Sequence, residues 1–254
     1  MEKRLNRQYP PVTRINKTEH TGMVKEIFST ITKRYDFLNH FLSMRRDIYW
    51  RRFTVKKMRF FRSYHFLDVA CGTADLAIMT AKKFHDTHTT GIDFVQAMLD
   101  QGQKKVFQKG LVHNISLANA DAIDLPFKDN TFDVSAIAFG IRNIPDRMAA
   151  LKEMIRVIVP GGQLMVLEMT YIRNPVLKKF YHLYLNRILP GIASLLSFNP
   201  AAYLYLADSI MNFPSPEKFA AMIEEAGLKE IKKYKLTFGI TYLYTGIKPE
   251  TPAP

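Results

Sequence analysis

The sequence predicts an α/β domain in which a mainly parallel sheet has helices on both faces. Short apolar segments alternate with segments of helical periodicity, and a glycine turn joins the first such pair. Strands that alternate with helices are joined by crossover connections, which favour parallel pairing. A chain of 254 residues with 47% hydrophobic residues fits one large domain with additions.

The prediction centres on residues 66–76, with the sequence FLDVACGTADL. Its apolar beginning is typical of the end of a buried strand, Gly72 and Thr73 suit a tight turn, and residues 75–81 suit a helix. Glycine lets the backbone approach a ligand closely, and a helix N-terminus offers free N–H groups. Strand, glycine turn and helix together indicate a nucleotide-type cofactor site.

A second strand, expected over residues 88–92, ends at Asp93, which lies 21 residues after Gly72. An acid at this place suits a pair of ribose hydroxyls. The turn lacks the three glycines that hold a dinucleotide pyrophosphate, and an acid, Asp68, lies beside it. Because acids repel a pyrophosphate but suit an ammonium and a sulfonium, we hypothesise a site for S-adenosylmethionine.

The N-terminal part is expected to be helical and basic. Residues 1–21 show no hydrophobic period, which predicts a flexible basic arm. From Gly22 the spacing becomes helical, with apolar side chains at Val24, Ile27, Phe28 and Ile31. With a further helix over residues 47–58, residues 22–60 should form a helical cap over the cofactor site.

The alternation of strands and helices then continues along the chain. We expect helices over 95–108 and 146–157, a turn at 160–162, and strands over 115–118, 132–138 and 164–169. The acidic loop at 119–122 could bind an adenine amino group. After a final helix over 215–227, strands over 228–236 and 240–247 should pair antiparallel at one edge.

Residues 172–213 interrupt this alternation and predict a helical insertion that includes a helix over 200–211. The first part carries an apolar stripe at Leu177, Tyr181, Tyr184 and Ile188. Such a stripe is usually core, and a substrate tunnel or a membrane-facing wall is the alternative.

The net charge of +13 is concentrated in residues 1–62, which hold 16 Lys and Arg but 5 Asp and Glu. This excess suits an anionic membrane surface or RNA. The single cysteine excludes an internal disulfide framework. Without the apolar core of a signal peptide or an apolar run of about 18 residues, we expect a cytoplasmic protein with peripheral contact at the inner face of the membrane.

Several longer motifs are more specific than the glycine turn. They are KRYDFLN at 33–39, WRRFT at 50–54, residues 67–76, LPFKDNTFD at 125–133, FGIRNI at 139–144, PGG at 160–162 and YLADSI at 205–210. Together they resemble the ubiquinone/menaquinone biosynthesis C-methyltransferases, the family that includes demethylmenaquinone methyltransferase. The similarity covers about residues 22–248.

The resemblance implies the class I methyltransferase fold, with a seven-stranded, mostly parallel sheet and an antiparallel edge strand, in a single domain over 22–254. It implies that the cofactor S-adenosylmethionine contacts Thr73, Asp93, Asp121 and Ala122. Asp68 and Gly72 would shape the site at its methionine end. No cluster in the sequence has metal-ligand spacing, so we expect no metal.

The chain departs from the family pattern at position 74, where alanine replaces glycine. A positive φ would cost Ala74 about 1 kcal/mol. We expect instead that Ala74 already belongs to the helix, where alanine is favourable.

The implied reaction moves a methyl group to a ring carbon of a reduced polyprenyl quinone precursor, most simply demethylmenaquinol. Arg142 could hold the ionised ring hydroxyl, and Asn143 could orient a ring oxygen or a water. Tyr35 and Asn39, from the cap, could close the pocket on the substrate. The polyprenyl tail would lie along residues 177–198, and basic residues 45–62 would meet anionic lipid.

Some alternatives stay open: a methyltransferase for another small aromatic substrate, or a non-catalytic S-adenosylmethionine-binding subunit of a quinone-synthesis complex. RNA is disfavoured as a partner, because FGIRN stands where base-methylating enzymes carry an Asn/Asp-Pro-Pro-Tyr/Phe element. Cys71 lies in the cofactor turn and is a poor candidate for a nucleophile, whereas His40 and His182 are candidate proton acceptors. The quinone ring, the tail length and the oligomeric state, a homodimer included, are not decided by the sequence.

Overall fold

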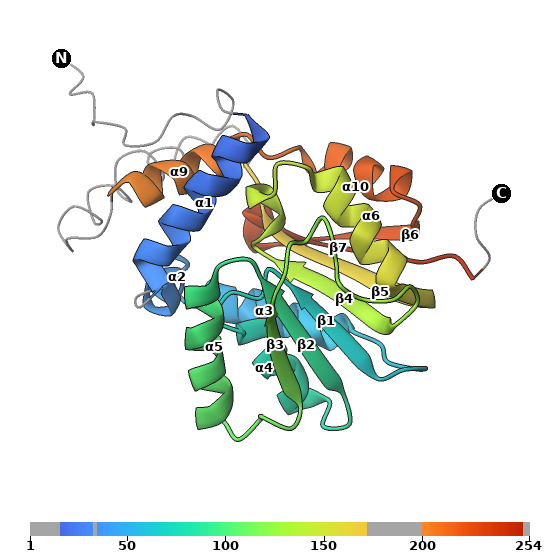
Figure 1. Cartoon of the computed structure of the whole chain (residues 1–254). Coiled ribbons are helices and arrows are strands. Elements are labelled where there is room, and N and C mark those ends of the chain that lie inside the picture. Colours follow the sequence, from blue (N-terminus) through green and yellow to red (C-terminus); the bar gives the residue numbers. More distant parts are fainter. Residues whose placement is uncertain (1–15, 33–34, 172–199, 251–254) are drawn as a thin grey trace, which may run out of the picture.

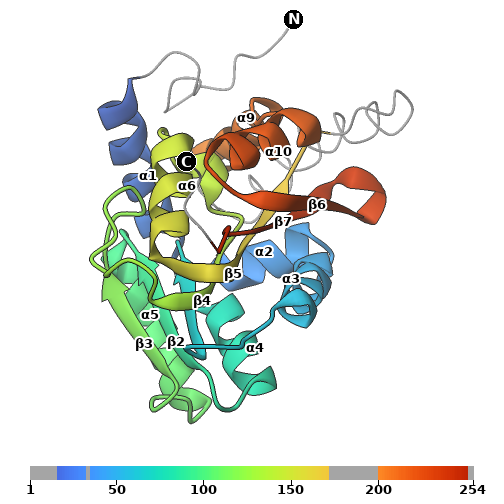
Figure 2. The same cartoon turned by 90° about the vertical axis from the view of Figure 1, so that its right-hand side faces the viewer.

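The computed structural model describes residues 16–32, 35–171 and 200–250. Over these residues the chain folds around one seven-stranded sheet with the order β3-β2-β1-β4-β5-β7-β6. The sheet crosses the middle of the molecule, and helices cover both of its faces (Figure 1 and Figure 2). This architecture confirms the predicted α/β fold.

The strands lie close to where the sequence predicts them. They are β1 (His65–Val69), β2 (His88–Asp93), β3 (Ile115–Asn119), β4 (Phe132–Ala138), β5 (Ile158–Met169), β6 (Lys229–Leu236) and β7 (Thr241–Ile247). β1 to β5 pair in parallel, and β7 runs antiparallel to both β5 and β6. The antiparallel strand therefore lies inside the sheet, and β6 forms the outer edge, where exposed lysines discourage pairing with another chain.

The helices form two layers and a cap. They are α1 (Lys17–Ile31), α2 (Tyr35–Leu42), α3 (Arg46–Lys57), α4 (Asp75–Lys83), α5 (Gln96–Gln108), α6 (Arg147–Val157), α9 (Pro200–Met211) and α10 (Pro216–Glu225), with short 3-10 helices η3 (Ile141–Asn143) and η5 (Thr237–Gly239). α3 and α4 share a core with one face of the sheet, and α6 and α10 share a core with the other. α1 packs against α9 beyond one end of the sheet (Figure 1).

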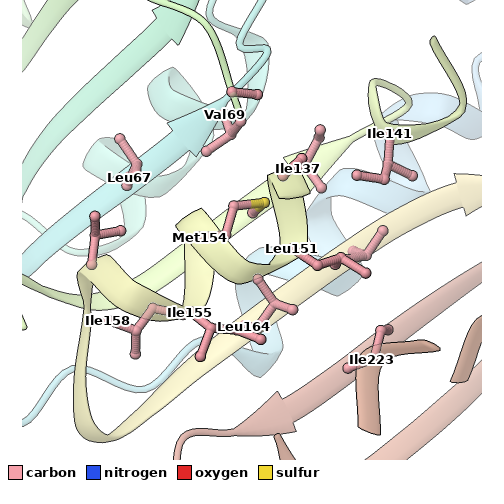
Figure 3. Packing of buried hydrophobic residues seen from close by; sticks show 14 of the residues in the cluster. Leu67, Val69, Ile137, Ile141, Leu151, Met154, Ile155, Ile158, Leu164 and Ile223 are labelled. Atoms are coloured by element: carbon pink, nitrogen blue, oxygen red, sulfur yellow. The ribbon is translucent and has the colours of Figure 1, made fainter. Parts of the chain in front are cut away.

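The central strands are buried on both faces, as a parallel sheet requires. Along β1, Phe66 packs on the side of α3 and α4, whereas Leu67 and Val69 pack on the side of α6 and α10. Figure 3 shows Leu151 and Met154 of α6 lying among these sheet side chains. A shift of one residue in the register of β1 would exchange the two faces and destroy both cores.

Two expected boundaries differ in the structure. α1 begins at Lys17 rather than at Gly22, because Asn16 and Glu19 form a capping box. Residues 17–21 are therefore helical, and residues 1–15 of the expected arm lie outside the described residues. The turn expected at 160–162 lies within β5, where Gly161 has a φ of +80° and the pairing with β4 is irregular. In the insertion, α9 has the expected bounds, and residues 172–199 lie outside the described residues.

A buried carboxylate, Asp133 of β4, anchors the segment that leads into β1. Its oxygens accept the backbone N–H groups of Phe61, Arg62, Ser63 and Tyr64 at 2.9–3.0 Å. Burial raises the pKa of Asp133, but these four donors outweigh burial and hold its pKa below 3.8. The carboxylate thus replaces the pairing partners that the segment lacks.

We expect Asp133→Asn to lower the free energy of unfolding by about 3 kcal/mol at neutral pH, because an amide leaves some of these N–H groups unpaired. The pKa of Asp133 is lowered in the folded state, so its contribution is present above 3.8 and is lost as the pH falls through the folded pKa. Urea unfolding should therefore show a difference that shrinks toward acid pH. Asp129→Asn, at an exposed carboxylate, is the control and should change stability by less than about 0.5 kcal/mol. An equal loss in both variants would contradict the anchoring role.

Candidate active site

A cleft of about 950 Å³, its open mouth included, lies beside the carboxyl ends of β1, β2 and β4. The order of the sheet reverses between β1 and β4, since the chain runs outward from β1 to β3 and then crosses to β4. Such a switch point is where open α/β sheets bind their ligands. α1 and α2 supply further walls, so the expected cap does border the cleft.

The glycine turn and the acid at the end of β2 meet in this cleft. Gly72 has a φ of +55°, and its N–H donates to Asp93 Oδ2 at 2.8 Å. The N–H of Val95 donates to Asp93 Oδ1 at 2.9 Å. Burial raises the pKa of Asp93, although the backbone donors oppose this. With the N–H of Phe94 as a further donor, the carboxylate still has room for another, so a ribose hydroxyl is a suitable partner.

The expectation for Ala74 is wrong. Ala74 has a φ of +66° and a ψ of +26°, so it is the left-handed N-cap of α4 and not a residue of the helix. This conformation costs an L-residue about 1–2 kcal/mol and favours glycine. The Ala74 side chain is 0% exposed, so burial of its methyl group offsets part of the cost.

Thr73 is buried, and its hydroxyl is directed at the cap. Thr73 Oγ1 donates to Asp36 of α2. Lys105 Nζ of α5 lies 2.7 Å from Asp36 Oδ2 and 3.1 Å from Thr73 Oγ1, and it also pairs with Asp75 of α4. This cluster joins the cap to the cofactor turn. The sequence analysis missed Asp36 and Lys105, because an ion pair over 69 residues leaves no local pattern.

Asp68 supports the turn from behind and does not line the cleft. Its Oδ2 accepts the N–H of Ala77 at 3.0 Å and so holds the first turn of α4. Burial raises the pKa of Asp68 to about 8, against the opposing effects of the Ala77 hydrogen bond and of Arg51. Most Asp68 side chains are therefore protonated at neutral pH in this structure.

The loop after β3 and the loop after β4 form two further walls. Asp121 and Ala122 line the cleft, and Asp121 Oδ1 accepts the N–H of Ile123 at 3.1 Å. Asp121 is exposed, so its carboxylate remains accessible to a ligand. Opposite, a Cβ on Gly140 would lie 2.8 Å from Ala70 Cβ, so only glycine lets the loops after β1 and β4 approach this closely.

A second pocket, of about 960 Å³ with its mouth, adjoins the first. Phe28, Tyr35 and Phe139 line both pockets, so the two spaces share a wall. Most of the second pocket is apolar, with walls at Ile27, Ile31, Leu38, Leu42, Ala202, Leu206 and Ile210. The structure brings three predicted substrate residues, Tyr35, Asn39 and Arg142, together in this pocket.

Arg142 in η3 belongs to a buried ion pair. Its Nη1 pairs with Glu168 and donates to Phe139 O at 2.8 Å, and its backbone N–H donates to Glu168 Oε2 at 3.1 Å. Burial lowers the pKa of Arg142, but the Glu168 carboxylate outweighs burial and raises it. Within the described part of the chain, Arg142 Nε is buried without a partner. The sequence analysis missed Glu168 because it lies inside an apolar strand.

Asn143 lines the first pocket, and its side chain is held by Tyr205, a residue that lines the second pocket. Its Oδ1 accepts a hydrogen bond from Tyr205 Oη of α9 at 2.9 Å, and His20 Nε2 of α1 lies 3.1 Å from the same hydroxyl. Burial, together with the charge of Arg147, lowers the pKa of His20, so His20 is neutral at pH 7. Tyr205 stands in the YLADSI motif, but nothing in the sequence places it beside Asn143.

The remaining candidates have structural partners. Burial raises the pKa of Cys71 well above its usual range, so Cys71 carries no thiolate nucleophile. His40 Nδ1 lies 2.8 Å from Asp47 Oδ2, and His182 lies outside the described residues. Arg51 is buried and pairs with Asp47 at 2.7 Å, so it is not part of a lipid-facing basic surface. Among the described residues, no group of three or more His, Cys, Asp or Glu could hold a metal.

Comparison with known proteins agrees with this geometry. The sequence model of the ubiE/COQ5 methyltransferase family matches residues 13–248. The chain belongs to this family. It is an S-adenosylmethionine-dependent C-methyltransferase with the class I fold, as the motifs led us to expect.

Relatives of this methyltransferase are similar over nearly their whole length. The ubiquinone/menaquinone biosynthesis C-methyltransferase UbiE of Geotalea daltonii is 43% identical over 232 residues, which are 91% of this chain and 98% of that protein. The demethylmenaquinone methyltransferase of Alkalihalophilus pseudofirmus is 38% identical over 226 residues, 89% of this chain and 95% of that protein. A methyltransferase structure from Aquifex aeolicus shares the fold, with a TM-score of 0.56 and 16% identity over 78% of this chain and 88% of that one.

Substitution of Ala74 tests the left-handed turn of the methyltransferase. Ala74→Gly should raise the free energy of unfolding by up to about 1 kcal/mol, because glycine relieves the positive φ but removes a buried methyl group. Ala77→Gly, inside α4, is the matched control and should lower it by about 1 kcal/mol or more. Urea unfolding measures both, and a loss of stability in both variants would contradict the left-handed assignment.

The pKa of Asp68 predicts a second effect on stability. Because the folded-state pKa of about 8 exceeds the ordinary 3.8, the contribution of Asp68 is fully present below 3.8 and is lost as the pH rises toward 8. Asp68→Asn keeps an acceptor for Ala77 and does not ionise. The variant should therefore gain stability over the wild type as the pH rises, by a few kcal/mol near the upper limit. Asp100→Asn, at an exposed residue, should show no such trend, and a pH-independent difference for Asp68→Asn would contradict the raised pKa.

Proposed function

We propose that this methyltransferase transfers a methyl group to a ring carbon of a reduced polyprenyl quinone precursor, demethylmenaquinol first and a ubiquinone precursor as a further acceptor. The observation that carries the proposal is the pair of pockets that share the wall of Phe28, Tyr35 and Phe139. Methyl transfer needs a donor and an acceptor that approach from separate sides and are aligned. The names of the relatives support a quinone precursor as acceptor.

The first pocket fits the methyl donor. Asp93 would accept hydrogen bonds from the ribose, Asp121 from the adenine amino group, and the backbone around Gly72 would admit the methionine part. Asp68 and Thr73 would act from behind by holding the turn. When bound, S-adenosylmethionine supplies an electrophilic methyl group on a sulfonium.

The apolar pocket fits an aromatic ring that carries a hydrocarbon tail. An ionised ring hydroxyl pushes electron density onto the neighbouring carbon, which then attacks the methyl group. The Arg142 guanidinium, held by Glu168, would stabilise this oxygen anion, and its unpartnered Nε shows donor capacity that the described residues leave unused. Arg142 is too basic to accept a proton.

Protons must leave the acceptor twice. The ring hydroxyl loses one before the attack, and the ring carbon loses another when aromaticity returns. The ring oxygen then regains one proton to give the quinol, so one proton is released in all. Asn143, oriented by Tyr205, would direct solvent water to receive these protons. Tyr35, in the wall shared by both pockets, would exclude water from the path of the methyl group.

The acceptor also implies a location. A polyprenyl quinol stays in a bilayer, so we place the enzyme in the cytoplasm, in peripheral contact with the inner face of the membrane. The alternatives are another small aromatic acceptor and a non-catalytic role as a cofactor-binding subunit.

Turnover by the purified chain tests the proposal. With S-adenosylmethionine and reduced short-tail demethylmenaquinone, we expect a product heavier by one methylene group in mass spectrometry. Cofactor binding without turnover would favour the non-catalytic subunit, and turnover only on tail-less aromatic compounds would favour a different acceptor. Either outcome would overturn the quinone assignment.

Variants of the buried pair test the mechanism. Arg142→Gln should lower kcat by about 100-fold or more, since it removes the charge that stabilises the ring oxygen, and should change the Kd of S-adenosylmethionine little. Because this change leaves Glu168 buried without a partner, the double variant Arg142→Gln/Glu168→Gln controls for stability. Arg156→Gln, at a half-buried arginine that pairs with Glu153 and lines neither pocket, should keep full activity. Near-normal kcat in the double variant would remove Arg142 from the mechanism.

A further inference from the structure

One side of α2 and the turn that follows it expose large apolar side chains. Phe37, Phe41 and Met44 are 56%, 48% and 81% exposed, although they follow one another at helical spacing. The rings of Phe37 and Phe41 stack with centroids 5.8 Å apart. Exposed Arg45 and Arg46 follow directly. We call these five residues the α2 surface.

α2 is apolar on two sides, and the two sides differ in what they meet. Leu38 and Leu42 line the apolar acceptor pocket. Phe37 and Phe41 lie on a neighbouring stripe of the helix and face solvent. A helix that only closes a pocket needs one apolar stripe. A second, exposed stripe of this size marks an interaction surface.

The turn after α2 is held in a fixed shape. Met44 and Arg45 have φ values of +51° and +60°, and the N–H of Arg45 donates to His40 O at 2.6 Å. After the turn, the buried Asp47 accepts a hydrogen bond from Ser43 Oγ at 2.7 Å and forms an ion pair with Arg51. Strained left-handed residues persist only where their surroundings hold them, so Met44 is presented to solvent by a rigid support.

We propose that the α2 surface docks on an anionic lipid bilayer. The proposal rests in part on the proposed function, since a tail-bearing acceptor has to pass from a membrane into the pocket behind α2. Stacked aromatic rings and a methionine suit the interfacial region of a bilayer, and adjacent arginines suit anionic headgroups. Within the described parts of the chain, no helix is long and apolar enough to span a membrane.

The charge of the surface favours lipid over a second copy of the chain. In a symmetric dimer the α2 surfaces of the two copies would face each other. Arg45 and Arg46 of one copy would then lie close to the same arginines of the other copy, and these like charges repel. An anionic bilayer instead satisfies the arginines and the apolar side chains at once.

Vesicle flotation of the purified full chain tests the docking surface. The wild type should bind vesicles of phosphatidylcholine with phosphatidylglycerol, less so at high salt, and should bind phosphatidylcholine alone weakly. Phe41→Gln/Met44→Gln should weaken binding about tenfold or more. Arg45→Gln/Arg46→Gln should weaken it about 30-fold, as expected for two headgroup contacts. The matched controls are Phe107→Gln, at a side chain 76% exposed on α5, and Lys109→Gln/Lys128→Gln, and both should bind as the wild type does.

The outcomes separate this proposal from the proposed function. S-adenosylmethionine binding and turnover of a tail-less quinol should be unchanged in all four variants, which also shows that they fold. Absent wild-type binding, or equal binding by all variants, would overturn the docking surface and leave the methyl transfer untouched. Two further results would also overturn the docking surface. One is a wild-type dimer in light scattering that dissociates in the Phe41/Met44 variant. The other is RNA binding in a mobility-shift assay that is lost only in the Arg45/Arg46 variant. Vesicle binding without any turnover would instead overturn the proposed function alone.

Discussion

The parallel pairing of β1 with β2 on one side and β4 on the other is the constraint on which the site depends. Val69 pairs with Ile92 and with Ile137, so the three strands end at the same edge of the sheet. Parallel strands connected through helices bring the residues after each strand together there. Asp93 and Arg142 thereby come to border neighbouring pockets although they are far apart in the sequence.

Backbone strain gathers at this edge. Ala70, Ala74 and Phe139 have φ values of +51°, +66° and +61°, and none of them is glycine. Such residues are tolerated where packed strands on either side determine their conformation. The turns after β1 and β4 are thus shaped for a ligand at some expense of stability. The glycine that the family pattern has at position 74 suits the positive φ of that residue.

The cap is part of the active site because partly buried charges tie it to the sheet domain. Lys105 joins Asp36 of α2 to Asp75 of α4, and Arg51 of α3 lies 4.0 Å from Asp75. Removing one partner of such a pair leaves a partly buried charge uncompensated, so these contacts favour a definite position for α2. That position puts Tyr35 into the wall that the two pockets share. It also leaves Phe37 and Phe41 of α2 exposed, so this surface can contact another molecule while the site stays closed.

The element order, the glycine turn, the acid at the end of β2 and the family could be predicted from the amino-acid sequence, because they depend on local periodicity and short motifs. Tertiary structure alone decided that Ala74 is left-handed, that Thr73 is directed at the cap, that Arg142 is bound to Glu168, and that Asn143 is held by Tyr205. Each of these features depends on a contact between distant segments or on the backbone conformation of one residue. Neither cause leaves a pattern in the neighbouring residues of the sequence. The strands could be predicted because buried apolar side chains recur at short intervals along the chain. A buried ion pair joins two residues that are distant in the sequence and leaves no repeating pattern.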